Sequence, residues 1–206
     1  MNLLCKSMGL TDETRSVTLR MVKIERQQKR KAEQTMNTEE DLLSQSSYAQ
    51  KAMKLFLEGY NCSQSVVLAF QDLHGLDVHT AARISSSFGG GMGRLREVCG
   101  SVSGMFLVIG LLYGYENPKA KEEKADHYQR IQELAARFEE KNHSIVCREL
   151  LGLGKGKDSF VPSERTDEYY KKRPCKELVG MAAAFVEEYI KENPLENKVN
   201  VSDYDC

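Results

Sequence analysis

The chain has 206 residues, of which 41% are hydrophobic and 29% are charged. This length suits one domain, or one domain with an extension, and the composition is that of an ordinary globular protein. The formal net charge of −1 gives no overall field that would attract nucleic acid or an anionic membrane, so we expect no nucleic-acid partner.

The N-terminal part differs from the rest because basic side chains are concentrated between residues 15 and 31. A few apolar residues lie among them at helical spacing. An amphipathic basic helix can lie on a membrane surface or bind a partner, but this apolar face is short. We therefore expect residues 1–36 to be a basic extension, either flexible or a lone helix. A helical domain over residues 37–193 and a polar tail over residues 194–206 would follow it.

Apolar residues recur at helical spacing through the expected domain, and the ends of each run carry capping residues, glycine or proline. The helices that these signals predict cover about residues 37–58, 61–75, 78–87, 98–115, 119–141, 145–151 and 174–193. The predicted N-caps are Asn37, Asn61 and Ser144, with Pro174 at the first position of the last helix. The sequence therefore predicts an all-α fold: one compact, bundle-like domain of about six or seven helices with few or no strands.

A glycine-rich segment lies at the centre of the chain, where eight of the fifteen glycines fall between residues 89 and 114. A loop comes first, with glycines at Gly89, Gly90, Gly91 and Gly93. Its backbone can adopt positive φ and approach other groups closely. Gly100 and Gly104 then lie four residues apart and share one face of the helix that follows. A face without side chains leaves room for another backbone or for a ligand.

Two other interpretations of this segment are weaker. The loop lacks the Lys-Ser/Thr pair of a phosphate-binding loop, and no predicted strand precedes it, which argues against nucleotide binding. Residues 98–115 carry no charge over eighteen positions, the lower limit for a membrane span. They include four glycines and two serines. We therefore expect a buried core helix there and no membrane span.

The six cysteines are widely spaced, and the sequence contains no CxxC pair. This spacing disfavours a zinc ribbon or finger and a local ferredoxin-type run. No secretory signal is visible at the N-terminus, so we expect a cytoplasmic location. In that compartment unpaired cysteines tend to be metal ligands, redox groups or inert core residues.

Four cysteines share one position, because each falls in the first turn of a predicted helix: Cys62, Cys99, Cys147 and Cys175. The free N–H groups and the dipole at a helix start favour a thiolate over a thiol. If these helices converge, several thiolates would meet at one place. Four thiolates would suit an iron–sulfur cluster or Zn²⁺, and two pairs would suit reversible disulfides. Arg94 and Arg96, close to Cys99, could lower a thiol pKa or balance the charge of a cluster.

Several segments together carry a family resemblance: GYNCSQ at 59–64, FGGGMGR at 88–94, EVCGSVSG at 97–104, CRELLG at 147–152, and Cys175. Over about residues 44–191 the chain resembles the C_GCAxxG_C_C family, whose members are regarded as redox-active. The family pattern has four cysteines and a Cys-Gly-Ala-x-x-Gly element. This chain has Ser101 in place of the alanine, and serine is nearly as small.

The resemblance implies a bacterial protein with a redox centre, formed by disulfides or by a prosthetic group such as an iron–sulfur cluster. It implies that the four cysteines are the redox or metal-ligating residues and that Gly100 and Gly104 are the family's glycines. The loop glycines Gly89–Gly93 would clear space for the centre. We expect a redox partner protein, and a homo-oligomer is compatible with the sequence. The competing interpretation is a non-enzymatic helical binding module with a structural Cys₄ zinc site or no metal. Whether the chain is an enzyme stays open.

Overall fold

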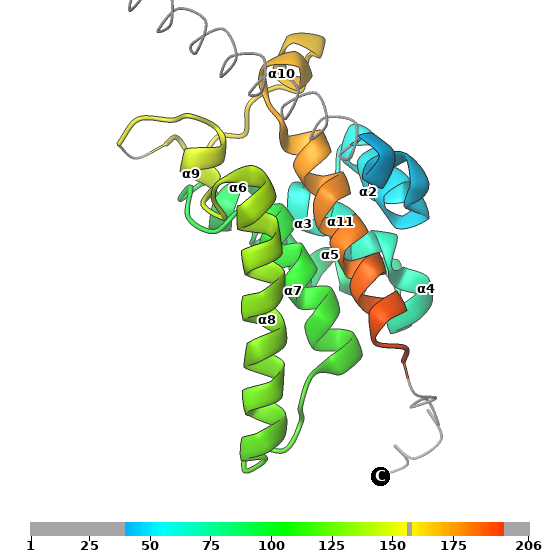
Figure 1. The fold of residues 1–206 in the computed structure, drawn as a ribbon. Helices are drawn as coiled ribbons and strands as arrows, with labels where there is room; N and C mark the ends of the chain where they lie inside the picture. The colour runs from blue at the N-terminus through cyan, green and yellow to red at the C-terminus, as the bar shows by residue number, and fades with distance from the viewer. Residues whose placement is uncertain (1–39, 156–157, 196–206) are drawn as a thin grey trace, which may run out of the picture. The chain divides into compact units, whose positions relative to one another are not determined.

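The computed structural model of the chain describes residues 40–155 and 158–195 (Figure 1). The chain divides into two units, Met1–Asp41 and Leu42–Cys206, and all the helices named below belong to the second. The predicted all-α class is confirmed: the described ranges contain the ten helices α2–α11, a helical segment at residues 40–45 that precedes them, and no strand. The expected extension over residues 1–36 lies outside these ranges, as does the tail beyond residue 195, and the domain boundaries stay a prediction.

The number of helices exceeds the expected six or seven because three short segments are also helical. These are α4 (Gln71–His74), α6 (Gly89–Met92) and α10 (Asp167–Lys172). The first is the end of a predicted helix, separated from the rest at Phe70. The second is a turn of the glycine loop. The third is a charged segment in which a few residues give too weak a periodic signal to predict a helix.

The prediction of one continuous helix over residues 37–58 is wrong, because the helix is interrupted at Ser46. Helix α2 (Ser47–Leu57) begins only after this residue, whose backbone is extended and whose Oγ accepts a hydrogen bond from the Ala49 N–H at 2.9 Å. The Ser46 hydroxyl also donates to Glu187. A serine hydroxyl forms its hydrogen bonds more favourably at a helix N-cap than in a helix interior. Ser46 therefore favours a new helix start over one continuous helix. Asn37 lies outside the described residues.

Helix α3 (Cys62–Ala69) begins where the sequence predicted it. The Asn61 side chain accepts from the Gln64 N–H, and the Gln64 side chain accepts from the Asn61 N–H, each at 3.0 Å. This reciprocal capping box satisfies two backbone donors and fixes the position of Cys62 as the first helical residue. Helix α5 (Val78–Ser86) follows, and Asp77 caps it.

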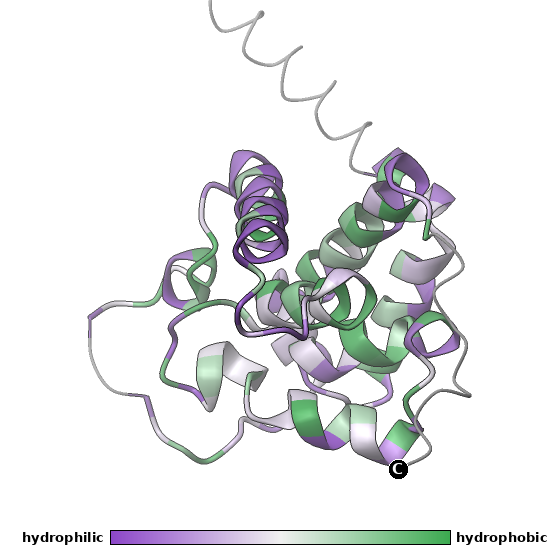
Figure 2. Cartoon of the chain, turned by 90° about the horizontal axis from the view of Figure 1, so that it is seen from below, coloured by the Kyte–Doolittle hydropathy of each residue, from purple (hydrophilic) through white to green (hydrophobic). Residues whose placement is uncertain are grey.

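The core is built by α3, α7 (Gly100–Tyr113), α8 (Lys121–Asn142) and α11 (Cys175–Glu192). Helix α11 packs on α2, α3, α7 and α8, and α7 packs on α3. Helix α8 lies beside α7 (Figure 1) and is hydrophilic over most of its surface (Figure 2), with only Leu134 and Phe138 buried. In the part of the chain that the structure describes, no helix is both long and apolar enough to cross a membrane.

Close packing of α7 on α3 depends on Gly104. A Cβ atom at this position would lie 2.9 Å from the Ser63 carbonyl oxygen and 2.9 Å from the Val66 Cβ. Contacts this short are overpacked, so the two helices would have to separate. On the glycine face predicted from the sequence, Gly104 therefore allows α7 to pack closely on α3.

We expect Gly104→Ala to lower the free energy of unfolding by about 1–3 kcal/mol, because its methyl group meets the backbone of α3. Gly110→Ala in the same helix is the matched control. No atom lies within 4 Å of its added Cβ, so we expect a gain of about 0.5–1 kcal/mol from the better helix propensity of alanine. Urea unfolding monitored by circular dichroism measures both changes. Equal effects of the two substitutions would contradict the packing role of Gly104.

Candidate functional site

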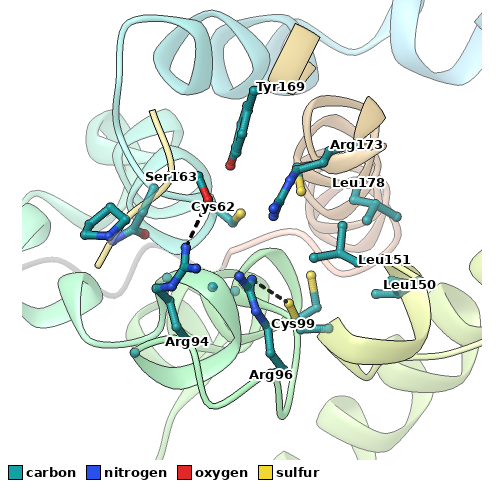
Figure 3. Close-up of a pocket in the computed structure, with 18 of the residues that line it drawn as sticks. Cys62, Arg94, Arg96, Cys99, Leu150, Leu151, Ser163, Tyr169, Arg173 and Leu178 are labelled. Atoms are coloured by element: carbon teal, nitrogen blue, oxygen red, sulfur yellow. Dashed lines mark hydrogen bonds between the residues drawn. The ribbon is translucent and has the colours of Figure 1, made fainter. Parts of the chain in front are cut away.

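Four helix starts meet at one cavity. Cys62, Cys147 and Cys175 are the first residues of α3, α9 (Cys147–Leu150) and α11, and Cys99 is the N-cap of α7. All four line a single cavity of about 280 Å³ (Figure 3). The structure thus places these cysteines, more than a hundred residues apart at the extremes, around one space.

Backbone pairing holds two of the cysteines in place. An isolated antiparallel bridge joins Val98 to Val146. On either side of it, the Cys99 N–H donates to the Ile145 carbonyl at 2.8 Å and the Cys147 N–H donates to the Glu97 carbonyl at 2.7 Å. These bonds tie the start of α7 to the start of α9, so the two cysteines are fixed relative to each other.

The predicted N-cap of the short helix at Cys147 is wrong. The N-cap is Val146, which makes no side-chain capping bond, and Ser144 lies two residues earlier. The Ser144 Oγ accepts from the Val146 N–H at 2.9 Å. Pairing of Val146 with Val98 keeps the chain extended up to Val146, so the helix begins later than its local sequence suggests.

The glycines near the cysteines divide between the cavity and the packing behind it. Those that line the cavity are Gly89, Gly90, Gly93 and Gly100. A Cβ at Gly100 would lie 3.0 Å from the Cys62 Cβ, so this glycine lets α7 approach Cys62. Gly91 does not line the cavity but supports Cys147 from behind, since its added Cβ would lie 2.6 Å from the Cys147 Cβ. Gly104 packs on α3, away from the cavity.

Cys62 and Cys175 interact with each other, and their pKa values move in opposite directions. Hydrogen bonding with Cys62 lowers the pKa of Cys175, and the positive charges of Arg173, Arg96 and Arg165 add to this effect. The same interaction, together with burial, raises the pKa of Cys62 well above its ordinary value. Of the two, Cys175 is therefore the sulfur that more readily becomes a thiolate.

The other two cysteines are neutral thiols. Burial raises the pKa of Cys99 to about 11 and also raises the pKa of Cys147. Where the helix starts were expected to favour several thiolates, only Cys175 has a lowered pKa. The physical reason is that desolvation of a buried thiolate outweighs the favourable field of a helix start.

Ser101, the residue that departs from the family pattern, contacts the site directly. Its Oγ and the Cys99 Sγ share a hydrogen bond of 3.1 Å. A hydroxyl there favours the thiolate of Cys99 and partly opposes the effect of burial on its pKa. The sequence indicates only that the serine is similar in size to the alanine of the family pattern. The structure shows that it adds a polar partner to the buried thiol.

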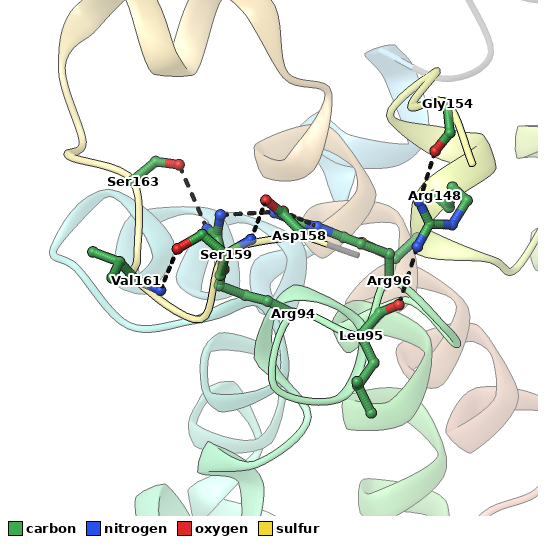
Figure 4. Close-up of polar contacts among 10 residues, drawn as sticks. Arg94, Leu95, Arg96, Arg148, Gly154, Asp158, Ser159, Val161 and Ser163 are labelled. Atoms are coloured by element: carbon green, nitrogen blue, oxygen red, sulfur yellow. Dashed lines mark hydrogen bonds and ion pairs between the residues drawn. The ribbon is translucent and has the colours of Figure 1, made fainter. Parts of the chain in front are cut away.

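Arg94 and Arg96 both point toward the cavity from a left-handed backbone, with φ of 69° and 64°. Both form ion pairs with Asp158 (Figure 4), at 3.1 Å for Arg94. The hydrogen bond from Arg96 and the charges of both arginines hold the pKa of Asp158 below its usual range. Arg96 also donates to the Cys147 Sγ at 3.8 Å. Arg96 is close to Cys99 in the sequence, but the thiol that it contacts is that of Cys147.

Sequence reasoning missed three further residues of the cavity: Arg165, Tyr169 and Arg173. Arg173 lies two residues before Cys175 in an Arg-Pro-Cys run, which is a signal that could have been recognised. Arg165 lies in a loop, and Tyr169 lies in the short helix α10 that follows this loop. Neither segment has a sequence pattern that indicates a site. Both residues are more than sixty positions from the glycine loop in the sequence, and the fold brings them to the same cavity.

The comparisons with known proteins agree with this site. A family model described as "Putative redox-active protein (C_GCAxxG_C_C)" matches residues 60–189, more than half of the chain, and the match includes all four cavity cysteines. The chain belongs to the C_GCAxxG_C_C family. No curated protein matched it, and no solved structure matched it either.

The donor chemistry of the site suits a soft metal or cluster, since four cysteines line one space. As arranged, however, no three His, Cys, Asp or Glu side chains within residues 40–155 and 158–195 are grouped so that they could hold a metal ion. The four cysteines are free thiols. The arrangement places Cys62 and Cys175 beside one another with pKa values shifted in opposite directions, and a metal would require the sulfurs to gather further.

We expect the pH dependence of alkylation to separate Cys175 from Cys99. Only the thiolate reacts, and the reaction levels off once pH exceeds the pKa. Because the pKa of Cys175 is lowered, its reaction with iodoacetamide should level off at a lower pH than that of an ordinary cysteine, whose pKa is about 8.5. Cys99, with a pKa of about 11, should still be increasing above pH 10. Mass spectrometry of labelled peptides gives both profiles.

Cys62→Ala is the matched variant for this measurement. It removes the thiol that donates to Cys175, so the profile of Cys175 should move to higher pH while that of Cys99 stays close to its wild-type position. An unchanged Cys175 profile in Cys62→Ala would show that the hydrogen bond between the two thiols does not set the charge of Cys175.

Proposed function

We propose that this member of the redox-active family works by thiol–disulfide exchange, with Cys175 as the attacking thiolate and Cys62 as the resolving thiol. The observation that carries the proposal is their placement: Cys62 and Cys175 begin α3 and α11, which pack together, and both line the cavity. The interaction between them also lowers the pKa of Cys175. A thiolate with a lowered pKa beside a protonated thiol is the arrangement that dithiol redox proteins need.

The exchange balances with a disulfide-bearing partner as oxidant. The Cys175 sulfur attacks one sulfur of the partner's disulfide, that S–S bond breaks, and the other partner sulfur leaves as a thiolate. Cys62 then gives up its proton to solvent and attacks the Cys175 sulfur, which releases the second partner thiolate. Two electrons pass from Cys62 and Cys175 to the partner, which is reduced to a dithiol.

The arginines assist this sequence by charge alone. Arg173, Arg96 and Arg165 each favour the thiolate of Cys175. When Cys62 later loses its proton, the same guanidinium groups would stabilise the new thiolate next to them, since all three line the cavity. Arginine suits this role because it stays protonated at any working pH.

Disulfide mapping tests the proposal. The reduced full-length chain is oxidised with glutathione disulfide, free thiols are blocked, and the peptides are analysed by mass spectrometry. We expect a Cys62–Cys175 cross-link as the first intramolecular product, with Cys99 and Cys147 blocked as free thiols. A first product that joins another pair, or no intramolecular disulfide at any ratio of glutathione disulfide to glutathione, would overturn the proposal.

A second candidate is an iron–sulfur protein, because all four cysteines line the same cavity as several arginines. Cys62, Cys99, Cys147 and Cys175 would hold the cluster, which would supply one-electron transfer. Anaerobic purification of the wild type and of Cys99→Ser, with an absorption spectrum and metal analysis, separates the candidates. Bound iron and colour, lost in the variant, would favour the cluster. Bound zinc without colour would favour a structural Cys₄ site, and a colourless metal-free protein supports thiol–disulfide exchange.

The proposed exchange requires a partner that carries a disulfide or dithiol. A redox protein of that kind is the partner class we propose. A cytoplasmic location and a homo-oligomer remain predictions from the sequence.

A further inference from the structure

We propose that the cavity beside the cysteines is a binding site for a small oxyanion, with Arg173 as its principal ligand. The inference deepens the proposed function by assigning a ligand class to the same cavity. It rests on the proposed function only where it predicts which redox form binds the anion more tightly.

The charge of the cavity wall is the first argument. Four arginines line it, Arg94, Arg96, Arg165 and Arg173, and no aspartate or glutamate among the described residues does. The carboxylate that pairs with Arg94 and Arg96 is Asp158, which sits outside the lining. One carboxylate shared by two guanidinium groups leaves a strongly positive space, and a positive concave site concentrates anions.

Arg173 is held in place but not neutralised. Its guanidinium lies over the Tyr169 ring, 4.8 Å from the ring centre. Among residues 40–155 and 158–195 it forms no ion pair with a carboxylate. In Figure 3 it points into the same space as Arg94 and Arg96, from the opposite side. A guanidinium whose orientation is fixed and whose N–H groups remain free matches the two oxygens of an oxyanion.

Arg165 is fixed in a similar way. It donates to the Phe56 carbonyl at 2.7 Å and to the Tyr60 carbonyl at 2.9 Å, and it stacks 4.7 Å from the centre of the Phe56 ring. These contacts satisfy part of its hydrogen-bonding capacity, and no carboxylate in the described part of the chain pairs with its charge. Because the side chain is already ordered, little entropy is lost when an anion binds next to it.

The size of the cavity limits the ligand. About 280 Å³ falls just below the range of about 300–1,000 Å³ that is typical of pockets for larger small molecules. Leu150, Leu151 and Leu178 form an apolar part of its wall, and Asn61 and Ser163 add polar groups. This space suits an oxyanion of the size of sulfate or phosphate, or the anionic end of a larger molecule.

The thiolate of Cys175 does not account for all of this positive charge. It contributes one negative charge in the reduced pair and none after a disulfide has formed. The oxidised form should therefore bind an anion more tightly than the reduced form. By linkage, the anion should then lower the reduction potential of the pair, because it stabilises the disulfide form.

Binding of sulfate and of phosphate, each measured by calorimetry at constant ionic strength with chloride as the balancing anion, tests the inference. We expect saturable binding to the full-length protein, weakened tenfold or more by Arg173→Gln. Arg83→Gln is the matched control, since Arg83 is exposed on α5 and does not line the cavity. Its binding should equal that of the wild type. Lack of saturable binding, or equal weakening by both substitutions, would overturn the inference.

A second variant, Arg173→Lys, tests the inference even if Arg173→Gln disturbs the fold. Arg173→Lys retains the charge but loses the planar fork, so we expect an intermediate affinity. Affinity as high as in the wild type would exclude Arg173 as a bidentate ligand and so contradict the inference. Phenyl phosphate distinguishes the source of the anion: competition with sulfate would indicate a larger molecule that presents its anionic end, and sulfate binding without competition would indicate a free oxyanion.

The two proposals fail separately. Sulfate binding to the double variant Cys62→Ser/Cys175→Ser, which cannot form the disulfide, measures the anion site alone. If sulfate binds this variant and the wild type forms no disulfide, the anion site stands and the exchange mechanism fails. If the Cys62–Cys175 disulfide forms but no anion binds in either redox state, the exchange mechanism stands and the anion site is refuted.

Discussion

Cys175→Ser is expected to abolish intramolecular disulfide formation and two-electron exchange with a disulfide partner. The variant removes the thiolate that hydrogen bonding from Cys62 and three nearby arginines stabilise. The remaining cysteines are poor substitutes because the pKa of each is raised, by the interaction with Cys175 and by burial for Cys62, and by burial for Cys99 and Cys147. We expect at least about a hundredfold slower reduction of glutathione disulfide, since a thiolate is needed for attack. Stopped assays that separate free thiols from mixed disulfides measure this rate.

Two further variants, Cys62→Ser and Cys99→Ser, test the roles of these cysteines in the exchange. Cys62→Ser keeps the attacking sulfur but removes the resolving one, so it should accumulate a mixed disulfide between Cys175 and glutathione. Cys99→Ser should still form the Cys62–Cys175 disulfide, because Cys99 is a buried thiol outside the pair. A stable mixed disulfide on Cys62 in Cys175→Ser, at the wild-type rate, would reverse the assignment of the two roles.

Gly91→Ala is expected to destabilise the protein and to displace Cys147. Gly91 has φ of +69°, a conformation that costs a residue with a side chain about 1–2 kcal/mol. Its added Cβ would also lie 2.6 Å from the Cys147 Cβ and 3.0 Å from the Glu97 backbone nitrogen. Such contacts force neighbouring backbone to move, at a further cost of about 1–3 kcal/mol. Urea unfolding of the reduced protein measures the sum.

Gly152→Ala separates the two contributions. Gly152 has φ of +61°, close to that of Gly91, but no atom lies within 4 Å of its added Cβ. It should therefore show the backbone cost without the clash. Equal destabilisation by the two substitutions would mean that the close approach of Gly91 to Cys147 is unimportant. A larger loss in Gly91→Ala, with altered labelling of Cys147, would support a role of the glycine loop in holding this cysteine.

The all-α class was predictable because its signals are local. The capping box of Asn61 and Gln64 acts within one turn, and the positive φ values of the loop glycines follow from their lack of a side chain. For the same reason all four cysteines could be placed near a helix start, and Cys62 at the first residue of its helix. Cys147 and Cys175 are the first helical residues where the sequence predicts residue 145 and Pro174, and Cys99 is an N-cap. Local prediction failed where distant contacts compete with it. Ser46 interrupts a helix with a hydroxyl that also reaches Glu187, and pairing with Val98 delays the helix at Val146.

The sequence by itself therefore determined the helical class, the membership of a redox-active family and the location of the four cysteines near helix starts. Only the tertiary structure decided that Cys62 and Cys175 share one cavity, that the pKa of Cys175 is the one lowered, and that Arg165 and Arg173 reach the cavity. The pKa of a thiol depends on its burial and on charges within a few ångströms. Both are set by how α3, α7 and α11 pack, and a linear pattern of residues does not contain that information.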